Sequence, residues 1–204
     1  HRVGRDADMK RLSLSGIVLA VAISPQSAST HLDPHPPHHV FELGDFALES
    51  GTILRDARIL YVTPGRLNPD RSNAVLVPSY YLGSHHSYDF LIGPERGLDP
   101  AEHFVIVAEM SGSGGSSSPS NTPAPQSQGD FPSVTIMDNV EAMYRVVTEG
   151  LGMPHLRAMV GHSMGAQQAL QWAVSHPGFM DLVVEIAGTA KTYPHGVVRL
   201  ESAL

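Results

Sequence analysis

The stretch Val160-Gly161-His162-Ser163-Met164-Gly165-Ala166 decides the fold. Strand-forming residues, 156–160, lead into it, and a helical pattern follows over 165–175. Strand, sharp turn and helix, in that order, form the context in which Gly-x-Ser-x-Gly builds a nucleophile elbow. Such a turn needs flanking glycines, because a Cβ would collide with the neighbouring chain. The pattern predicts Ser163 as a nucleophile with the Met164 N–H as an oxyanion donor. The alternative is a tight strand-to-helix connection of the kind found in any α/β protein.

The elements around this stretch predict a mostly parallel sheet. Short apolar runs typical of buried strands occupy 74–77, 104–108 and 180–186. Thr135 followed by Asp138 three residues later is typical of a helix start. Strands that alternate with helices indicate an α/β fold with helices on both faces of the sheet. Turn residues divide the earlier segment 40–62 into strand-like runs, which predict an antiparallel entry to that sheet.

Composition limits the classes of partner. The chain has 204 residues, of which 42% are hydrophobic and 16% charged, enough for one domain with a substantial core. Its formal charge of −7, from 13 basic and 20 acidic residues, argues against nucleic acid as a partner. The chain contains no cysteine, which excludes disulfides and thiolate metal sites.

The N-terminal region, residues 1–30, predicts an extension with a secretory signal. Met9-Lys10-Arg11 precedes an apolar run over 12–23, and small residues follow to Thr30. The apolar run is too short for a membrane span, which needs roughly 20 residues. We therefore expect a secreted or periplasmic protein without a stable membrane span, or a cytoplasmic one if the run is instead a buried first strand or helix.

Residues 31–39 are rich in proline and histidine and carry no periodicity, which predicts a solvated linker before a domain over 40–204. Four of the 12 histidines fall in this segment, so metal binding is the alternative. Residues 111–129 are rich in Ser, Gly, Pro and Gln. Composition fits either a flexible linker or an ordered loop lining a site.

Several motifs, in order and at similar spacing, resemble the homoserine O-acetyltransferase branch of the α/β-hydrolases. The resemblance runs from about Val40 to the end of the chain and is most specific around 134–139 and 163–172. The segments that carry it are Asn73-Ala-Val-Leu-Val, Phe131-Pro-Ser-Val-Thr-Ile-Met-Asp-Asn-Val140, Gly161-His-Ser-Met-Gly-Ala-Gln-Gln-Ala-Leu-Gln-Trp-Ala173 and Lys191-Thr-Tyr-Pro-His195.

This resemblance implies an α/β-hydrolase fold in which Ser163 carries a transient acyl group. It implies oxyanion donors at the N–H groups of Met164 and Tyr81, and it favours an ordered loop over 111–129. No cofactor or metal is expected. The substrate is expected to be a small acyl ester or acyl-CoA, and the oligomeric state stays open, a dimer included. Ser79-Tyr80, together with His162 and Ala166 in the elbow, departs from the acetyltransferase pattern and favours the hydrolase-like members.

The remaining triad partners are expected after the nucleophile, in the order acid and then histidine. The acids after Ser163 are Asp181, Glu185 and Glu201, and the histidines are His176 and His195. None has the expected position, and His162 is expected to point away from the hydroxyl. We therefore expect the N-terminal part of an α/β-hydrolase domain without its C-terminal strands and lid. The alternatives are an inert truncated fragment with an exposed apolar sheet edge, or an exported His-rich metal-binding protein.

Overall fold

The computed structural model describes residues 36–202. The predicted signal segment and most of the predicted linker lie outside the described residues. Within residues 36–202, none of the helices combines the length and the apolar character that crossing a membrane would require.

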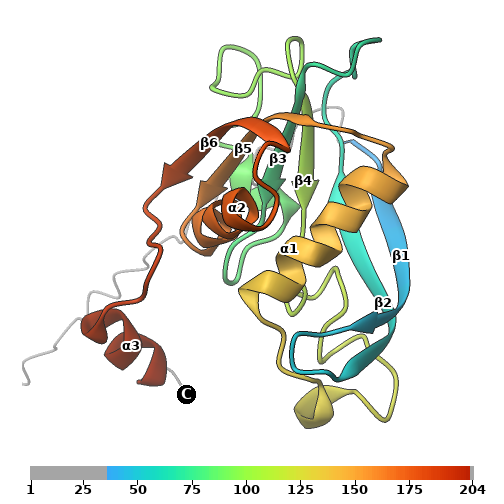
Figure 1. The fold of residues 1–204 in the computed structure, drawn as a ribbon, viewed down its shortest axis with the longest axis vertical. Coiled ribbons are helices and arrows are strands. Elements are labelled where there is room, and N and C mark those ends of the chain that lie inside the picture. Colours follow the sequence, from blue (N-terminus) through green and yellow to red (C-terminus); the bar gives the residue numbers. More distant parts are fainter. Residues whose placement is uncertain (1–35, 203–204) are drawn as a thin grey trace, which may run out of the picture. The chain divides into compact units, whose positions relative to one another are not determined.

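The strands of this region form one six-stranded sheet with the order β1-β2-β4-β3-β5-β6 (Figure 1). β1 pairs with β2 and β2 with β4 in the antiparallel sense, whereas the β3–β4, β3–β5 and β5–β6 pairs are parallel. The predicted antiparallel entry and parallel remainder are thus confirmed. The strands are β1 (His38–Ala47), β2 (Ile53–Val62), β3 (Ala74–Pro78), β4 (Phe104–Ala108), β5 (Leu156–His162) and β6 (Met180–Ile186).

The helix predicted at Thr135 begins where the sequence placed it. The Thr135 side chain accepts from the Asp138 N–H, and the Asp138 carboxylate accepts from the Thr135 N–H, a capping box. The helical segments are η1 (His85–Tyr88), η2 (Gln128–Asp130), α1 (Ile136–Arg145), the π-helical turn η3 (Val146–Gly150), α2 (Met164–Ser175) and α3 (Pro194–Glu201).

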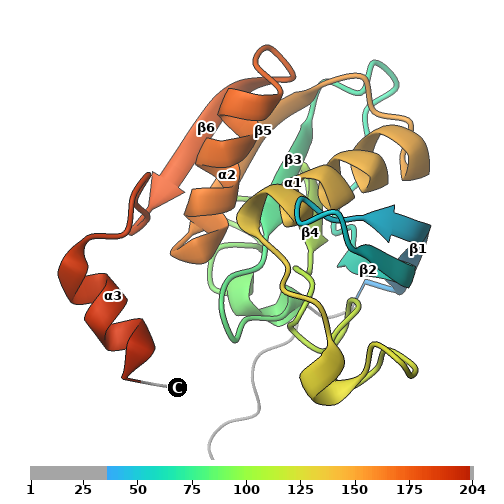
Figure 2. The ribbon, with the colours of Figure 1, turned by 60° about the horizontal axis from the view of Figure 1, so that its bottom comes forward.

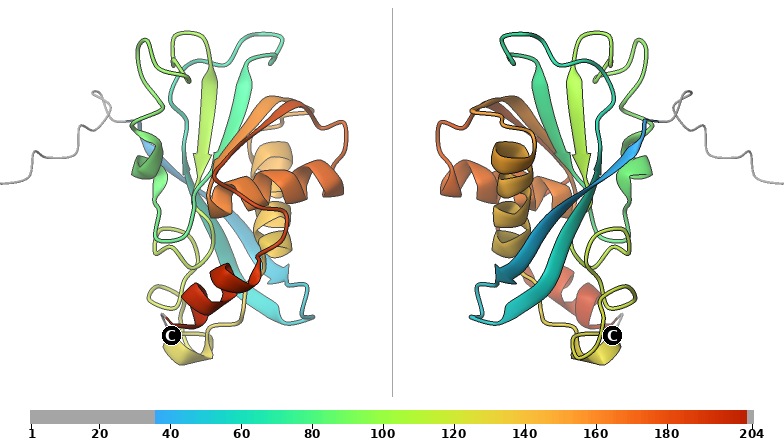
Figure 3. Two further views of the ribbon diagram at one scale, coloured as in Figure 1. Left: turned by 90° about the vertical axis from the view of Figure 1, so that its left-hand side faces the viewer. Right: turned by 90° about the vertical axis from the view of Figure 1, so that its right-hand side faces the viewer.

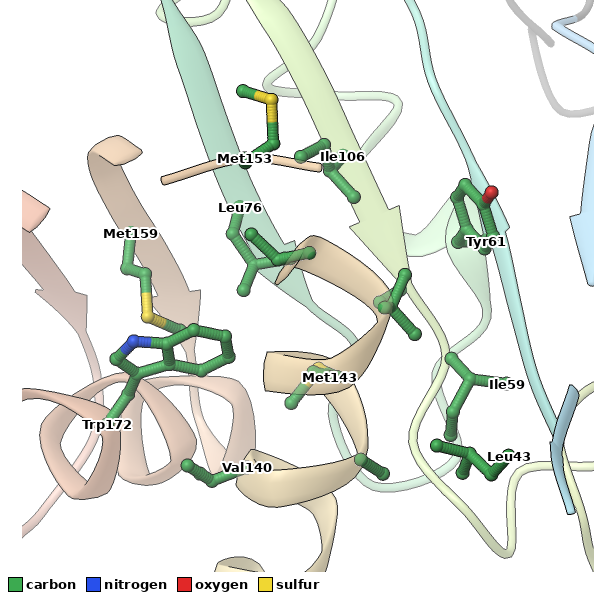
Figure 4. Packing of buried hydrophobic residues seen from close by; sticks show 14 of the residues in the cluster. Leu43, Ile59, Tyr61, Leu76, Ile106, Val140, Met143, Met153, Met159 and Trp172 are labelled. Atoms are coloured by element: carbon green, nitrogen blue, oxygen red, sulfur yellow. The ribbon is translucent and has the colours of Figure 1, made fainter. Parts of the chain in front are cut away.

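The two faces of the sheet are covered differently. Helices α1 and α2 lie together on one face (Figures 2 and 3), where Leu76, Ile106 and Met159 point toward Met143 and Trp172 (Figure 4). Side chains that alternate with these along the strands point to the other face, where they pack with Tyr88, Ile92 and Leu98. The chain between β3 and β4 therefore covers that second face, and it carries the short helix η1.

The linker predicted over 31–39 extends two residues too far, because β1 already begins at His38. His38 and His39 pair with Val62 and Tyr61 of β2, and the His39 ring stacks on the Tyr61 ring with centroids 5.3 Å apart. The prolines at 36 and 37 marked the segment as linker, yet the strand starts directly after them.

β6 is an edge of the described sheet, because it pairs with β5 alone. Its apolar side chains Leu182, Val184 and Ile186 are 52%, 43% and 36% exposed. Because alternate residues of a strand point to the same face, these three side chains form a partly exposed apolar strip on one face of β6.

Candidate active site

The turn between β5 and α2 has the geometry of a nucleophile elbow. Ser163 is the N-cap of α2 and has φ 53° and ψ −119°, a backbone conformation that costs a non-glycine residue about 1–3 kcal/mol. The Ser163 N–H donates to the Ile186 carbonyl at 2.9 Å, and the Ser163 carbonyl accepts from the N–H of Ala166 at 3.1 Å. These bonds hold the strained residue at the positive end of α2.

The two glycines of the motif are required by close backbone contacts. A Cβ on Gly161 would lie 2.3 Å from the Gly165 carbonyl oxygen. A Cβ on Gly165 would lie 2.5 Å from the Pro78 carbonyl oxygen and 2.7 Å from the Tyr88 hydroxyl. Neither distance leaves room for a side chain, so both glycines are needed for the elbow and for its contact with the end of β3.

The loop after β3, which carries Tyr81, is held against α2 and the elbow. The Gln168 side-chain amide donates to the Ser79 carbonyl at 2.8 Å, and both residues are fully buried. The Tyr80 ring meets the His162 ring edge-on with centroids 5.0 Å apart. Tyr81 and Met164, the predicted oxyanion donors, thus lie on two segments that pack together.

The Tyr88 side chain links the end of β3 to the elbow. Its hydroxyl donates to the Pro78 carbonyl at 2.9 Å and accepts from the His162 N–H at 3.0 Å. The side chain is fully buried, and this burial raises the Tyr88 pKa to about 12, although the bond from His162 lowers it. The phenol is therefore neutral near pH 7 and can donate.

We expect Tyr88→Phe to lower the free energy of unfolding by about 1–3 kcal/mol, because it leaves buried polar groups of Pro78 and His162 without their partner. Urea denaturation at pH 8, below the range in which the phenol ionises, measures the change. Tyr81→Phe is the matched control, because Tyr81 is 57% exposed. Equal stability of the wild type and Tyr88→Phe would contradict this role.

Within residues 36–202 the Ser163 hydroxyl makes no hydrogen bond to a histidine. His176 instead lies 3.0 Å from Glu141. Asp181 contacts His155 and Arg157, whose hydrogen bonds lower its pKa. Asp181 and His176, two of the candidate acids and histidines after Ser163, therefore have other partners.

The segment 111–129 is an ordered loop bound to β2. The buried Ser116 hydroxyl accepts from the Leu60 N–H at 2.9 Å and donates to the Glu109 carbonyl at 2.7 Å. The Ser117 hydroxyl accepts from the Arg58 N–H at 2.9 Å. Serine hydroxyls of the loop thus form hydrogen bonds with backbone groups of β2 that lie beyond its short pairing with β4. The alternative of a flexible linker is therefore wrong.

The start of this loop and the Tyr81 loop enclose a cavity of about 330 Å³. Its lining is formed by Tyr81, Leu82, Met110, Ser111, Gly112 and Ser113. The cavity therefore borders one of the two predicted oxyanion donors.

Sequence reasoning missed Tyr88 and Gln168, which fix the site without belonging to its motif. Both act across the fold, bonding to residues at the end of β3 or in the elbow. No local pattern marks either residue, because only the folded arrangement brings their partners within reach.

Comparison with known proteins places the chain in a family. The sequence model described as the alpha/beta hydrolase fold matches residues 73–199. An ethyl acetate hydrolase of Pseudomonas veronii is 39% identical over 162 residues, which cover 79% of this chain and 46% of that protein. A homoserine O-acetyltransferase of Nautilia profundicola is 39% identical over 165 residues, 72% of this chain and 45% of that protein.

The solved structures agree with the sequence comparisons. An acetylester hydrolase of Corynebacterium glutamicum superposes with a TM-score of 0.79 at 39% identity, over 81% of this chain and 48% of that one. The chain thus spans about half the length of the relatives it matches. On the matching family model and these relatives, the chain belongs to the α/β-hydrolase family, in a branch that includes esterases and homoserine O-acetyltransferases.

Proposed function

We propose that the protein containing this chain is a serine acyl-transfer enzyme that hydrolyses small acyl esters through an acyl-Ser163 intermediate. The strained elbow carries this proposal, because a non-glycine residue at φ 53° between a buried strand and a helix N-terminus costs stability, and strain of this kind clusters at active sites. The N–H groups of Met164 and Tyr81 would stabilise the oxyanion.

The reaction would proceed in two balanced steps. The Ser163 oxygen forms a bond to the ester carbonyl carbon, the alcohol leaves with the proton that Ser163 gave up, and an acyl-enzyme results. Water then cleaves the acyl-enzyme and releases the carboxylic acid. The base that accepts the Ser163 proton, and the carboxylate that orients it, are proposed to lie in the part of the protein that corresponds to the unmatched half of the relatives.

Two observations favour water over an amino-acid hydroxyl as the acceptor. Tyr80 and His162, both departures from the acetyltransferase pattern, contact one another beside the elbow. In addition, the export predicted from residues 9–30 would place the reaction where acetyl-CoA is absent. The homoserine O-acetyltransferase relative supports acyl transfer to homoserine as the second candidate.

Parallel assays separate the two functions. We expect the natural gene product to hydrolyse p-nitrophenyl acetate and ethyl acetate, and to form no O-acetylhomoserine from acetyl-CoA and homoserine. Release of CoA that depends on homoserine would reverse the assignment in favour of transfer. Turnover in neither assay would contradict both functions.

A further inference from the structure

Three histidines from distant parts of the sequence meet beside the first strand. His38 begins β1, whereas His85 and His86 open η1. One ligand nitrogen from each side chain lies within 4.8 Å of those of the other two. The His85 ring centroid is 4.5 Å from that of His38 and 4.0 Å from that of His86.

Carboxylates lie beside two of these rings, at the Nδ1 atom. His85 Nδ1 lies 2.7 Å from Glu109 Oε1, and the same oxygen accepts from the His85 backbone N–H at 3.0 Å. His86 Nδ1 lies 3.4 Å from Asp89 Oδ2. The Glu109 contact on Nδ1 fixes the tautomer of His85 and leaves its Nε2 as the ligating atom, the arrangement that accompanies histidine ligands in zinc sites.

Glu109 is itself fixed in place. The side chain is 3% exposed, and a Cβ on Gly115 would lie 2.0 Å from Glu109 Oε2, so only glycine allows the carboxylate this position. A carboxylate held in this position is well suited to orient a ligand.

From this geometry we propose that His38, His85 and His86 bind one Zn²⁺ ion, with Glu109 orienting the ring of His85. Zinc–nitrogen bonds of about 2.0–2.1 Å require two ligand atoms to lie no more than roughly 4.2 Å apart. His38 is exposed and His86 half-buried, so rotation of these two side chains can close the remaining gap around the buried His85. A water molecule would complete a tetrahedral site.

Such an ion would fasten the start of β1 to the segment that follows the Tyr81 loop. The composition of residues 31–39 favoured a solvated linker, with metal binding by that segment as the alternative, whereas the partners of His38 proposed here lie more than forty residues away in the sequence. The proposal concerns stability and does not depend on the acyl-transfer function.

Zinc titration of the full chain by isothermal calorimetry, with melting temperature as a second readout, tests the site. We expect one Zn²⁺ per chain at this site and a melting temperature that rises with zinc concentration. Glu109→Gln keeps an acceptor for the His85 backbone and should weaken zinc binding by about 10- to 100-fold. His38→Gln and His86→Gln remove ligands and should weaken binding further.

His39→Gln is the matched control, since His39 adjoins His38 but stacks on Tyr61 outside the cluster. It should keep wild-type zinc affinity and the zinc-dependent rise in melting temperature. Wild-type affinity in either His38→Gln or His86→Gln, both of which change side chains that are not fully buried, would overturn the proposal. Such a result would assign any bound zinc to other histidines of the chain.

Discussion

Ser163→Ala should lower kcat for ester hydrolysis by roughly 10⁴-fold or more, the scale seen when a catalytic serine is removed. The hydroxyl is the atom proposed to form the acyl bond, and no other group at the elbow can replace it. The substitution should leave the free energy of unfolding nearly unchanged, because within residues 36–202 the fold relies on the Ser163 backbone bonds and not on its hydroxyl.

The measurement is a comparison of kcat and KM for p-nitrophenyl acetate in the natural gene product and its variants, with urea denaturation of each. Ser133→Ala provides the control, because Ser133 is an exposed serine in the segment before α1. It should retain full activity. Activity of Ser163→Ala within tenfold of the wild type would exclude the acyl-Ser163 mechanism.

Gly161→Ala should both destabilise the fold and abolish activity. The added Cβ would lie 2.3 Å from the Gly165 carbonyl oxygen, 2.4 Å from the Gly165 carbonyl carbon and 2.5 Å from the Ala166 nitrogen. All three are backbone atoms, so no side-chain rotation relieves the overlap and the turn must open. We expect the free energy of unfolding to fall by about 1–3 kcal/mol or more.

Gly129→Ala is the matched control, because nothing lies within 4 Å of a Cβ at that position. Urea denaturation and ester hydrolysis should be close to wild type for Gly129→Ala and impaired together for Gly161→Ala. The joint loss distinguishes Gly161→Ala from Ser163→Ala, which should lose activity alone. A Gly161→Ala protein with wild-type stability and activity would show that the turn does not need its tight geometry.

The local elements of the fold could be predicted because local chemistry specifies them. The capping box at Thr135 predicted the start of α1, and the structure confirms it. The elbow could be predicted in the same way, because Gly-x-Ser-x-Gly between a strand and a helix is typical of this turn.

Contacts between distant segments could not be predicted in this way. Trp172 of α2 is fully buried against the rings of Tyr144 and Phe179, which lie in other segments of the chain. Likewise, Tyr88 and the histidine cluster acquire their roles only once the sheet order brings η1 beside β1 and β4. Composition could not distinguish an ordered loop from a flexible linker over 111–129. Serines that hydrogen-bond to the backbone of a neighbouring strand look the same in the sequence as serines in a linker.

The central claim is that the Ser163 hydroxyl takes up the acyl group, and covalent labelling tests it most directly. A fluorophosphonate probe transfers its phosphonyl group to an activated serine oxygen with loss of fluoride, and peptide mass spectrometry locates the adduct. For the natural gene product we predict a single adduct on Ser163, absent in Ser163→Ala. An adduct on a different serine, or none at Ser163 in a protein that hydrolyses esters, would contradict the account.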